Sequence, residues 1–188
     1  AVEFRAVGSL QVAEIGQGGQ DVDVGAELAD VAPAADQGPP ADATVLFDGS
    51  DLSHWRMADG SPAQWKVEDG YFEVIPQSGN IFTKAEFGSV QLHLEFATPA
   101  KVESASQGRG NSGFYAHGRY EVQILDSFGL EGEHNECGGI YSTQAPRINM
   151  CFPPLTWQTY DIDFTAAKFD DQGKKTDNAK MTVKHNGV

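Results

Sequence analysis

Residues 44–188 consist largely of short segments in which apolar and polar side chains alternate. One of them, residues 90–97, keeps a strict period of two, which is typical of a strand with one buried face. Two shorter segments meet at Asp69 and Gly70, a common pair in tight turns. Since no stretch has a convincing amphipathic helical period, the pattern predicts an all-β sandwich. The predicted strands cover residues 64–68, 71–75, 80–83, 90–97, 111–115, 119–125, 138–142, 157–165 and 179–185.

A β-hairpin is predicted within residues 109–127, where two alternating runs are separated by a short loop that ends at Gly118. A two-residue loop of His117 and Gly118 would mix apolar and polar side chains on both faces. We therefore predict a three-residue loop, residues 116–118, with Gly118 in the left-handed conformation that such loops require. One face of the hairpin is then mostly apolar and carries Ser112, Phe114, Tyr120, Val122 and Ile124.

The opposite face of the hairpin is a row of polar side chains. It carries Asn111, Tyr115, Arg119, Glu121 and Gln123. One interpretation is a plain solvent-exposed face. The other is a groove for a carbohydrate, since amide, carboxylate and guanidinium groups together donate and accept hydrogen bonds in fixed directions, as a ligand rich in hydroxyl groups requires.

The formal net charge of the 188 residues is −14. A nucleic-acid partner is not expected, because phosphate binding needs a basic stripe and none is visible. No membrane span is expected either, because no apolar run approaches the ~20 residues that cross a bilayer. The acidity suits a periplasmic or extracellular protein. The first residues show neither an initiator Met nor a signal peptide, which predicts a mature, processed or partial chain.

Residues 1–43 differ in composition from the rest of the chain. They contain eight acidic residues against Arg5 alone, and so hold −7 of the net charge. From residue 16 onward they are rich in Gly, Ala, Asp and Pro, which predicts an acidic linker. Residues 2–7 alternate, and we predict that they form a strand that completes a sheet, in this chain or in a neighbouring one. The predicted domain itself covers residues 44–188.

Six motifs follow one another along this domain. They are residues 46–55 (LFDGSDLSHW), 110–115 (GNSGFY), 120–127 (YEVQILDS), 137–141 (CGGIY), 153–161 (PPLTWQTYD) and 185–188 (HNGV). Together they resemble the bacterial 3-keto-disaccharide hydrolase domain family. The resemblance implies a concanavalin- or laminarinase-like jelly roll that acts on sugars oxidised at C3, usually outside the cytoplasm. Such domains continue past the turn at Asn186 and Gly187 to a Val-x-Phe-Arg-like strand. We therefore expect a jelly roll that lacks its last strands, and residues 2–5 resemble the missing one.

The implied chemistry needs a base and an oxyanion stabiliser. A ketone at C3 acidifies the proton at C2, so that the bond at C1 breaks by β-elimination and water then adds. Glu121, central in the polar row, is the first candidate for the base, and His134 on the following loop is the second. Arg109 or Arg119 would stabilise the oxyanion. Asn111, Tyr115 and Gln123 would orient the sugar hydroxyls.

Two other functions fit the sequence. A conventional two-carboxylate glucanase would use Glu121 and Asp126. An unbulged strand places the Cα atoms of these residues about 16 Å apart on opposite faces, whereas the two carboxyl groups of a retaining enzyme lie ~5 to 5.5 Å apart. Only a bulge near Leu125 would bring Asp126 to the same face. A non-catalytic carbohydrate-binding or structural module would favour exposed tryptophans. The strand-like patterns around Trp55, Trp65 and Trp157 instead predict core positions.

Cys137 and Cys151 are the two cysteines of the chain. An oxidising compartment would join them in a disulfide, and the alternative is two buried free thiols. His134, Glu136 and Cys137 lie close in sequence but lack the paired spacing of a structural zinc site. No cofactor is predicted with certainty, and a divalent ion such as calcium, held by carboxylates, has no location in the sequence.

Overall fold

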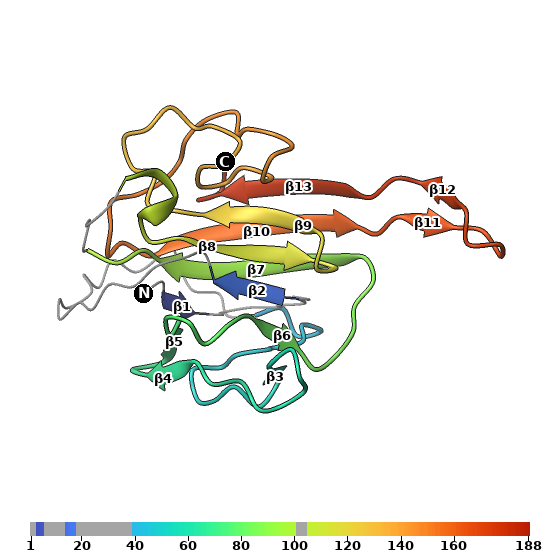
Figure 1. Cartoon of the computed structure of the whole chain (residues 1–188), viewed down its shortest axis with the longest axis horizontal. Coiled ribbons are helices and arrows are strands. Elements are labelled where there is room, and N and C mark those ends of the chain that lie inside the picture. Colours follow the sequence, from blue (N-terminus) through green and yellow to red (C-terminus); the bar gives the residue numbers. More distant parts are fainter. Residues whose placement is uncertain (1–2, 6–13, 18–38, 101–104) are drawn as a thin grey trace.

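The computed structural model describes residues 3–5, 14–17, 39–100 and 105–188. Within these residues the regular elements are strands, apart from the 3₁₀ turn η1 (Ser106–Gly108). The strands form two antiparallel sheets that face each other, with a narrow hairpin projecting from one end (Figure 1). This is the jelly-roll β-sandwich that the sequence predicts. No helix in the described part of the chain has the length and apolar character of a membrane span.

The larger sheet has six strands and is built around β7 and β10, the two longest strands. In both, every second residue points into the sandwich, as the period of two predicts. In spatial order the strands are β13 (Lys180–His185), β10 (Gln158–Thr165), β7 (Val90–Ala97), β1 (Glu3–Arg5), β5 (Tyr71–Glu73) and β4 (Lys66–Glu68).

The second sheet has five strands and carries the predicted hairpin at one edge. In spatial order its strands are β3 (Trp55–Arg56), β6 (Ile81–Thr83), β2 (Glu14–Gln17), β8 (Ser112–Ala116) and β9 (Tyr120–Ile124). The edge of β9 is bordered by the predicted strand 138–142, which is reduced to isolated antiparallel bridges from Ile140 to Val122 and to Gln144. Backbone hydrogen bonds from Gly138 to Gln123 and from Tyr141 to Glu121 hold this segment in place.

Two strands from the N-terminal segment lie inside the sheets. β1 pairs with both β5 and β7, so the prediction of a sheet-completing strand in residues 2–7 is confirmed for Glu3–Arg5, within this chain. β2 lies between β6 and β8, where the composition of the segment gave no sign of a strand. Most of the predicted acidic linker, residues 18–38, lies outside the described residues.

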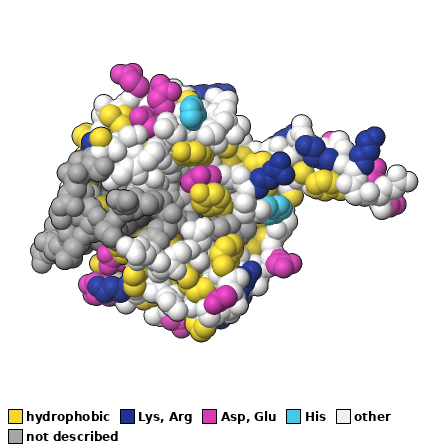
Figure 2. Space-filling view, in the orientation of Figure 1, with side chains coloured by type: hydrophobic (Ala, Val, Ile, Leu, Met, Phe, Trp, Pro, Cys, Tyr) yellow, Lys and Arg dark blue, Asp and Glu magenta, His cyan; other side chains and the backbone are white. Residues whose placement is uncertain are grey.

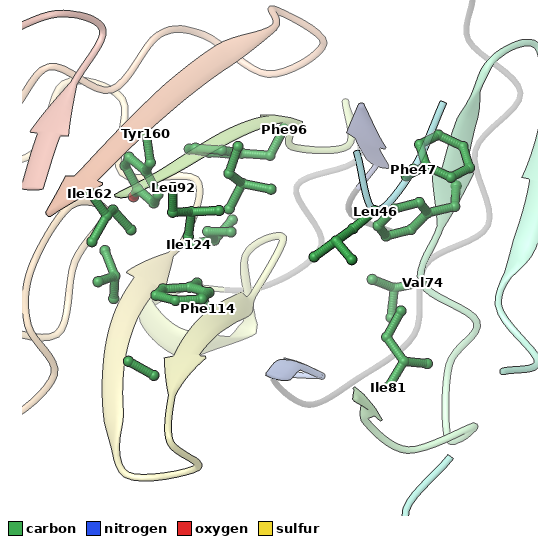
Figure 3. Packing of buried hydrophobic residues seen from close by; sticks show 14 of the residues in the cluster. Leu46, Phe47, Val74, Ile81, Leu92, Phe96, Phe114, Ile124, Tyr160 and Ile162 are labelled. Carbon is green, nitrogen blue, oxygen red and sulfur yellow. The ribbon is translucent and has the colours of Figure 1, made fainter. Parts of the chain in front are cut away.

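The core between the sheets is aromatic and aliphatic. Figure 3 shows Phe114 and Ile124 of the hairpin turned toward Tyr160 and Ile162 of the opposite sheet. Trp55, Trp65 and Trp157 are all buried, as predicted, at 0%, 4% and 4% exposure. The Trp55 indole N–H donates to the carbonyl of Leu46 at 2.8 Å, so its polar atom is satisfied inside the core.

The β8–β9 hairpin has the two faces that the sequence predicts. Phe114 and Val122 are paired and buried, and Tyr115 and Glu121 are paired on the opposite face. The loop has three residues as predicted, but it covers residues 117–119 rather than 116–118, since Ala116 pairs with Tyr120. His117 and Gly118 both have positive φ values, of 54° and 60°. The loop therefore uses the left-handed conformation at two residues, and not at Gly118 alone as predicted.

A second hairpin was not predicted. β11 (Lys168–Phe169) and β12 (Lys175–Asp177) form a two-stranded ribbon that projects from the sandwich (Figure 1). Figure 2 shows Lys side chains along it, and Phe169 is 61% exposed. Its residues are solvent-exposed on both faces, so they carry no apolar alternation from which a strand could be predicted.

Candidate active site

Glu121 lies on the polar face of the hairpin, partly buried and directly opposite Tyr115. Its side chain extends over Gly113, where a methyl group added to the glycine Cα would lie 2.5 Å from the carboxylate Oε1. Glycine at this position therefore provides the space that the carboxylate occupies. The Tyr115 hydroxyl donates a hydrogen bond to the same carboxylate. Two residues of one strand thus fix the position of one carboxylate on the next.

Burial raises the pKa of Glu121 above its ordinary value, and this outweighs the opposite effect of the hydrogen bond from Tyr115. A carboxylate with a raised pKa is a stronger base than an exposed one. The geometry and the electrostatics of Glu121 therefore suit proton abstraction.

Gln107 in η1 connects the start of β8, strand β9 and the loop that follows β9. Its side-chain amide donates to the carbonyl of Asn135 at 2.7 Å, and its Oε1 accepts from the Gln123 amide at 2.8 Å. The Asn111 amide donates to the backbone carbonyl of Gln107 at 2.8 Å. This amide network attaches the loop that follows β9 to the start of β8.

Arg109 and Asp126 form an ion pair at the end of β9. The Nε and Nη2 groups of Arg109 both donate to Asp126 Oδ2, at 3.1 and 2.6 Å. The carboxylate is almost fully buried, with 2% of the side chain exposed, whereas 26% of the Arg109 side chain is exposed. The buried partner therefore fixes the guanidinium, while its Nη1 is not engaged by Asp126.

His134 lies on the loop after β9, and its side chain is exposed. The loop is braced by Glu136, whose carboxylate accepts from the backbone N–H groups of Gly132 and Glu133 at 2.8 and 2.9 Å. It is also bound through Asn135 to Gln107. His134 thus sits on a fixed loop beside the amide network, with its side chain exposed to solvent.

The structure places the predicted residues in three sets of contacts, Tyr115 with Glu121, Asn111 and Gln123 with Gln107, and Arg109 with Asp126. It also changes the expected roles of three residues. Gln123 is 1% exposed and Asp126 is 2% exposed, so neither can contact a sugar directly, and both instead hold neighbouring side chains. Arg119 lies in the hairpin turn, exposed, with its guanidinium 5.8 Å from the ring centroid of Tyr120 rather than at Glu121. Of the two arginines predicted to stabilise an oxyanion, Arg109 is the one held in the cluster.

Gln107 was not predicted from the sequence. Its partners lie 4, 16 and 28 residues away along the chain, and no motif connects them. Its spacing of four from Asn111 was the only available signal. We call Gln107, Arg109, Asn111, Tyr115, Glu121, Gln123 and Asp126 the polar cluster.

The two cysteines are free thiols in this structure, so the predicted disulfide is not formed. They are nevertheless close enough for each thiol to shift the pKa of the other. In the described parts of the chain, no group of three or more His, Cys, Asp or Glu side chains is arranged to hold a metal ion.

Comparison with known proteins identifies a family and similar solved structures. Residues 42–188 match the family described as the 3-keto-alpha-glucoside-1,2-lyase-like domain. A crystal structure of a candidate glycosyl hydrolase from Parabacteroides distasonis ATCC 8503 is 42% identical, with a TM-score of 0.75 over 80% of this chain. This chain spans 64% of that protein's length. A second candidate glycosyl hydrolase from the same organism is 20% identical, with a TM-score of 0.55 over 77% of this chain and 68% of its own, and supports the fold. No curated protein is matched.

Proposed function

The chain belongs to the 3-keto-alpha-glucoside-1,2-lyase-like domain family, and from this premise we propose that it cleaves the glycosidic bond of 3-keto-glycosides with Glu121 as the base. Membership supports a carbohydrate-active hydrolase domain. The finer proposal rests on one observation: Glu121 is a single partly buried carboxylate, oriented by Tyr115 and given space by Gly113. The other carboxylate of the polar cluster, Asp126, is buried.

The reaction proceeds in two stages. Glu121 takes the proton from C2, and the electron pair of the C2–H bond moves toward the C3 carbonyl, whose oxygen becomes negative. When the electron pair on the oxygen re-forms the C3 carbonyl, the C1–C2 double bond forms and the leaving group departs from C1 with the pair of the C1–O bond. Water then adds across the double bond, with its oxygen at C1 and a proton at C2, and a free 3-keto sugar results.

Arg109 is the proposed stabiliser of the developing oxyanion. A fixed cation near a developing negative charge needs no reorganisation during the reaction, which is why such groups accelerate it. Asp126 holds the guanidinium through two of its nitrogens and leaves Nη1 for the substrate. Tyr115 binds the Glu121 carboxylate, and Asn111 lies on the same strand face near the start of β8. Both are assigned to sugar hydroxyls in this proposal.

A conventional two-carboxylate mechanism fits the polar cluster poorly. Its second carboxylate would be Asp126, which is 2% exposed and ion-paired with Arg109. A nucleophile must reach C1 of the sugar, and a general base must reach a water molecule beside it. Asp126 in this position can do neither.

The test compares two substrates, a 3-keto-glucoside and its parent glucoside. We expect the wild-type chain to cleave the 3-keto-glucoside alone, and Glu121→Gln to lose ~10² to 10⁴ of the rate, the usual contribution of a general base. Glu86→Gln, at an exposed position after β6, is the matched control and should keep its activity. Cleavage of the parent glucoside would contradict the proposal. Binding of either sugar without cleavage would show a binding module instead.

A further inference from the structure

The Cys137 and Cys151 thiols both interact with Leu125 at the end of β9. Cys151 Sγ donates to the backbone carbonyl of Leu125 at 3.6 Å, and the backbone N–H of Leu125 interacts with the Cys137 sulfur. The two thiols also perturb each other's acidity, so they lie close together. The next residue, Asp126, holds the Arg109 side chain. Two adjacent sulfur atoms, contributed by different loops, therefore support the strand end that positions Arg109.

The surroundings of the two thiols differ. Cys137 is fully buried, and its Sγ lies 3.1 Å from the Tyr160 hydroxyl. Cys151 is 7% exposed and is followed by Phe152, which is 39% exposed. One thiol thus lies at the boundary of the core and the other lies inside it.

The pKa values of the two thiols are also shifted in opposite directions. Burial raises the pKa of Cys137 well above its ordinary value. Hydrogen bonds from Cys137 and from the Ser127 backbone, the former the larger effect, lower the pKa of Cys151 despite its partial burial. Cys151 therefore forms a thiolate, the reactive species, more readily than its partner.

A shared metal ion does not explain the pair, since within the described ranges no third His, Cys, Asp or Glu joins the two sulfurs in a metal-binding arrangement. We propose that Cys137 and Cys151 form a thiol–disulfide couple in which Cys151 reacts first with a small disulfide and Cys137 resolves the intermediate. This goes beyond the proposed function and does not depend on it.

The exchange balances with a low-molecular-weight disulfide, such as glutathione disulfide, as the oxidant. The Cys151 thiolate attacks one of its sulfurs, its S–S bond breaks, and one glutathione thiolate leaves. The Cys137 thiolate then attacks Cys151 Sγ, the internal disulfide forms, and the second glutathione thiolate leaves. The two cysteines lose two electrons in total and the small disulfide gains them, while the two departing thiolates take up the two protons.

The internal disulfide would close a loop of 15 residues, from Cys137 to Cys151. Closing such a loop restricts the unfolded chain and should raise the melting temperature by about 6 to 12 °C for a chain of this size. The closed loop includes the segment that borders β9. Oxidation therefore stabilises the edge of the sheet that carries Glu121.

The experiment incubates the folded 188-residue chain with glutathione disulfide, and then counts free thiols after denaturation and weighs the protein. We expect both thiols to disappear together, with a mass loss of two hydrogens and the rise in melting temperature given above. Two free thiols, or an oxidised form that melts no higher than the reduced one, would overturn the proposal. Neither readout uses the sugar reaction, so failure here would leave the proposed function untouched.

Two variants test the order of reaction. Cys137→Ser should keep one glutathione on Cys151, because the resolving thiol is gone. Cys151→Ser should remain unmodified while folded, because Cys137 is fully buried. Faster modification of Cys137 in the second variant than of Cys151 in the first would contradict the assignment. If a variant does not fold, the wild-type reaction is stopped early and the glutathione adduct is located by peptide mapping. An adduct on Cys151 is expected, and an adduct on Cys137 would contradict the assignment.

Discussion

Gly113→Ala tests how closely the activity depends on the position of the Glu121 carboxylate. The added methyl group would lie 2.5 Å from Oε1, and contacts become ordinary only at 3.4 Å, so the carboxylate must move by about 0.9 Å. A misplacement of about 1 Å at a reacting group can lower the rate by about 10²-fold. We therefore expect a loss of that size in kcat on a 3-keto-glucoside. The fold should remain intact, since alanine suits a strand better than glycine does.

Gly88→Ala is the matched control, because a methyl group there meets nothing within 4 Å and should leave the rate unchanged. The assay measures product release at saturating substrate, with circular dichroism and a melting curve for each variant. If Gly113→Ala folds normally and keeps the wild-type kcat, the carboxylate position does not matter and the reasoning about Glu121 is refuted. A parallel loss in both variants would point to a general effect of the added methyl group instead.

Two further predictions concern stability. Burial lowers the pKa of His185 from its ordinary value of 6.5 to about 4, so between these pH values the unfolded chain binds more protons than the folded one. The folding stability present above pH 6.5 is therefore lost as the pH falls through this window, by about 3 kcal/mol in total at 1.36 kcal/mol per pKa unit. Urea denaturation across the window measures this loss, and an NMR titration of the His185 ring measures its pKa. A ring that titrates at its ordinary pKa would contradict the prediction. Gln107→Ala should lower the free energy of unfolding by about 1–3 kcal/mol, because the buried Gln123 amide loses its acceptor, the Oε1 atom of Gln107. A change within about 0.5 kcal/mol is usual for surface substitutions, and would show that the amide network does not hold the loop.

The fold was predictable where one face of a strand is buried. The predicted division of the β8–β9 hairpin into a core face and a polar face was correct, although the predicted loop was misplaced by one residue. Moving a three-residue loop by one position changes which residues pair across the hairpin, but each side chain stays on the same face. The projecting β11–β12 hairpin could not be predicted, since neither face is buried. The position of β2 depends on two long-range pairings, with β6 and β8, that leave no local pattern.

The candidate site was predictable in its residues more than in its roles. Glu121 and Tyr115 could be placed together from alternation alone. The burial of Gln123 and Asp126 depends on loops that cover the end of β9, and alternation within a strand carries no information about such cover. Gln107 acts through contacts with three separate segments, which only the folded chain brings together.

Transfer of the C2 proton is the most direct test of the proposed reaction. The chain is incubated with a 3-keto-glucoside in deuterated water, and the released sugar is analysed by NMR at early times against a sample without protein. Elimination followed by hydration predicts one solvent deuterium at C2 of the product, and no such product from Glu121→Gln. A product that keeps its original hydrogen at C2 would show direct hydrolysis at C1 and would contradict Glu121 as the C2 base.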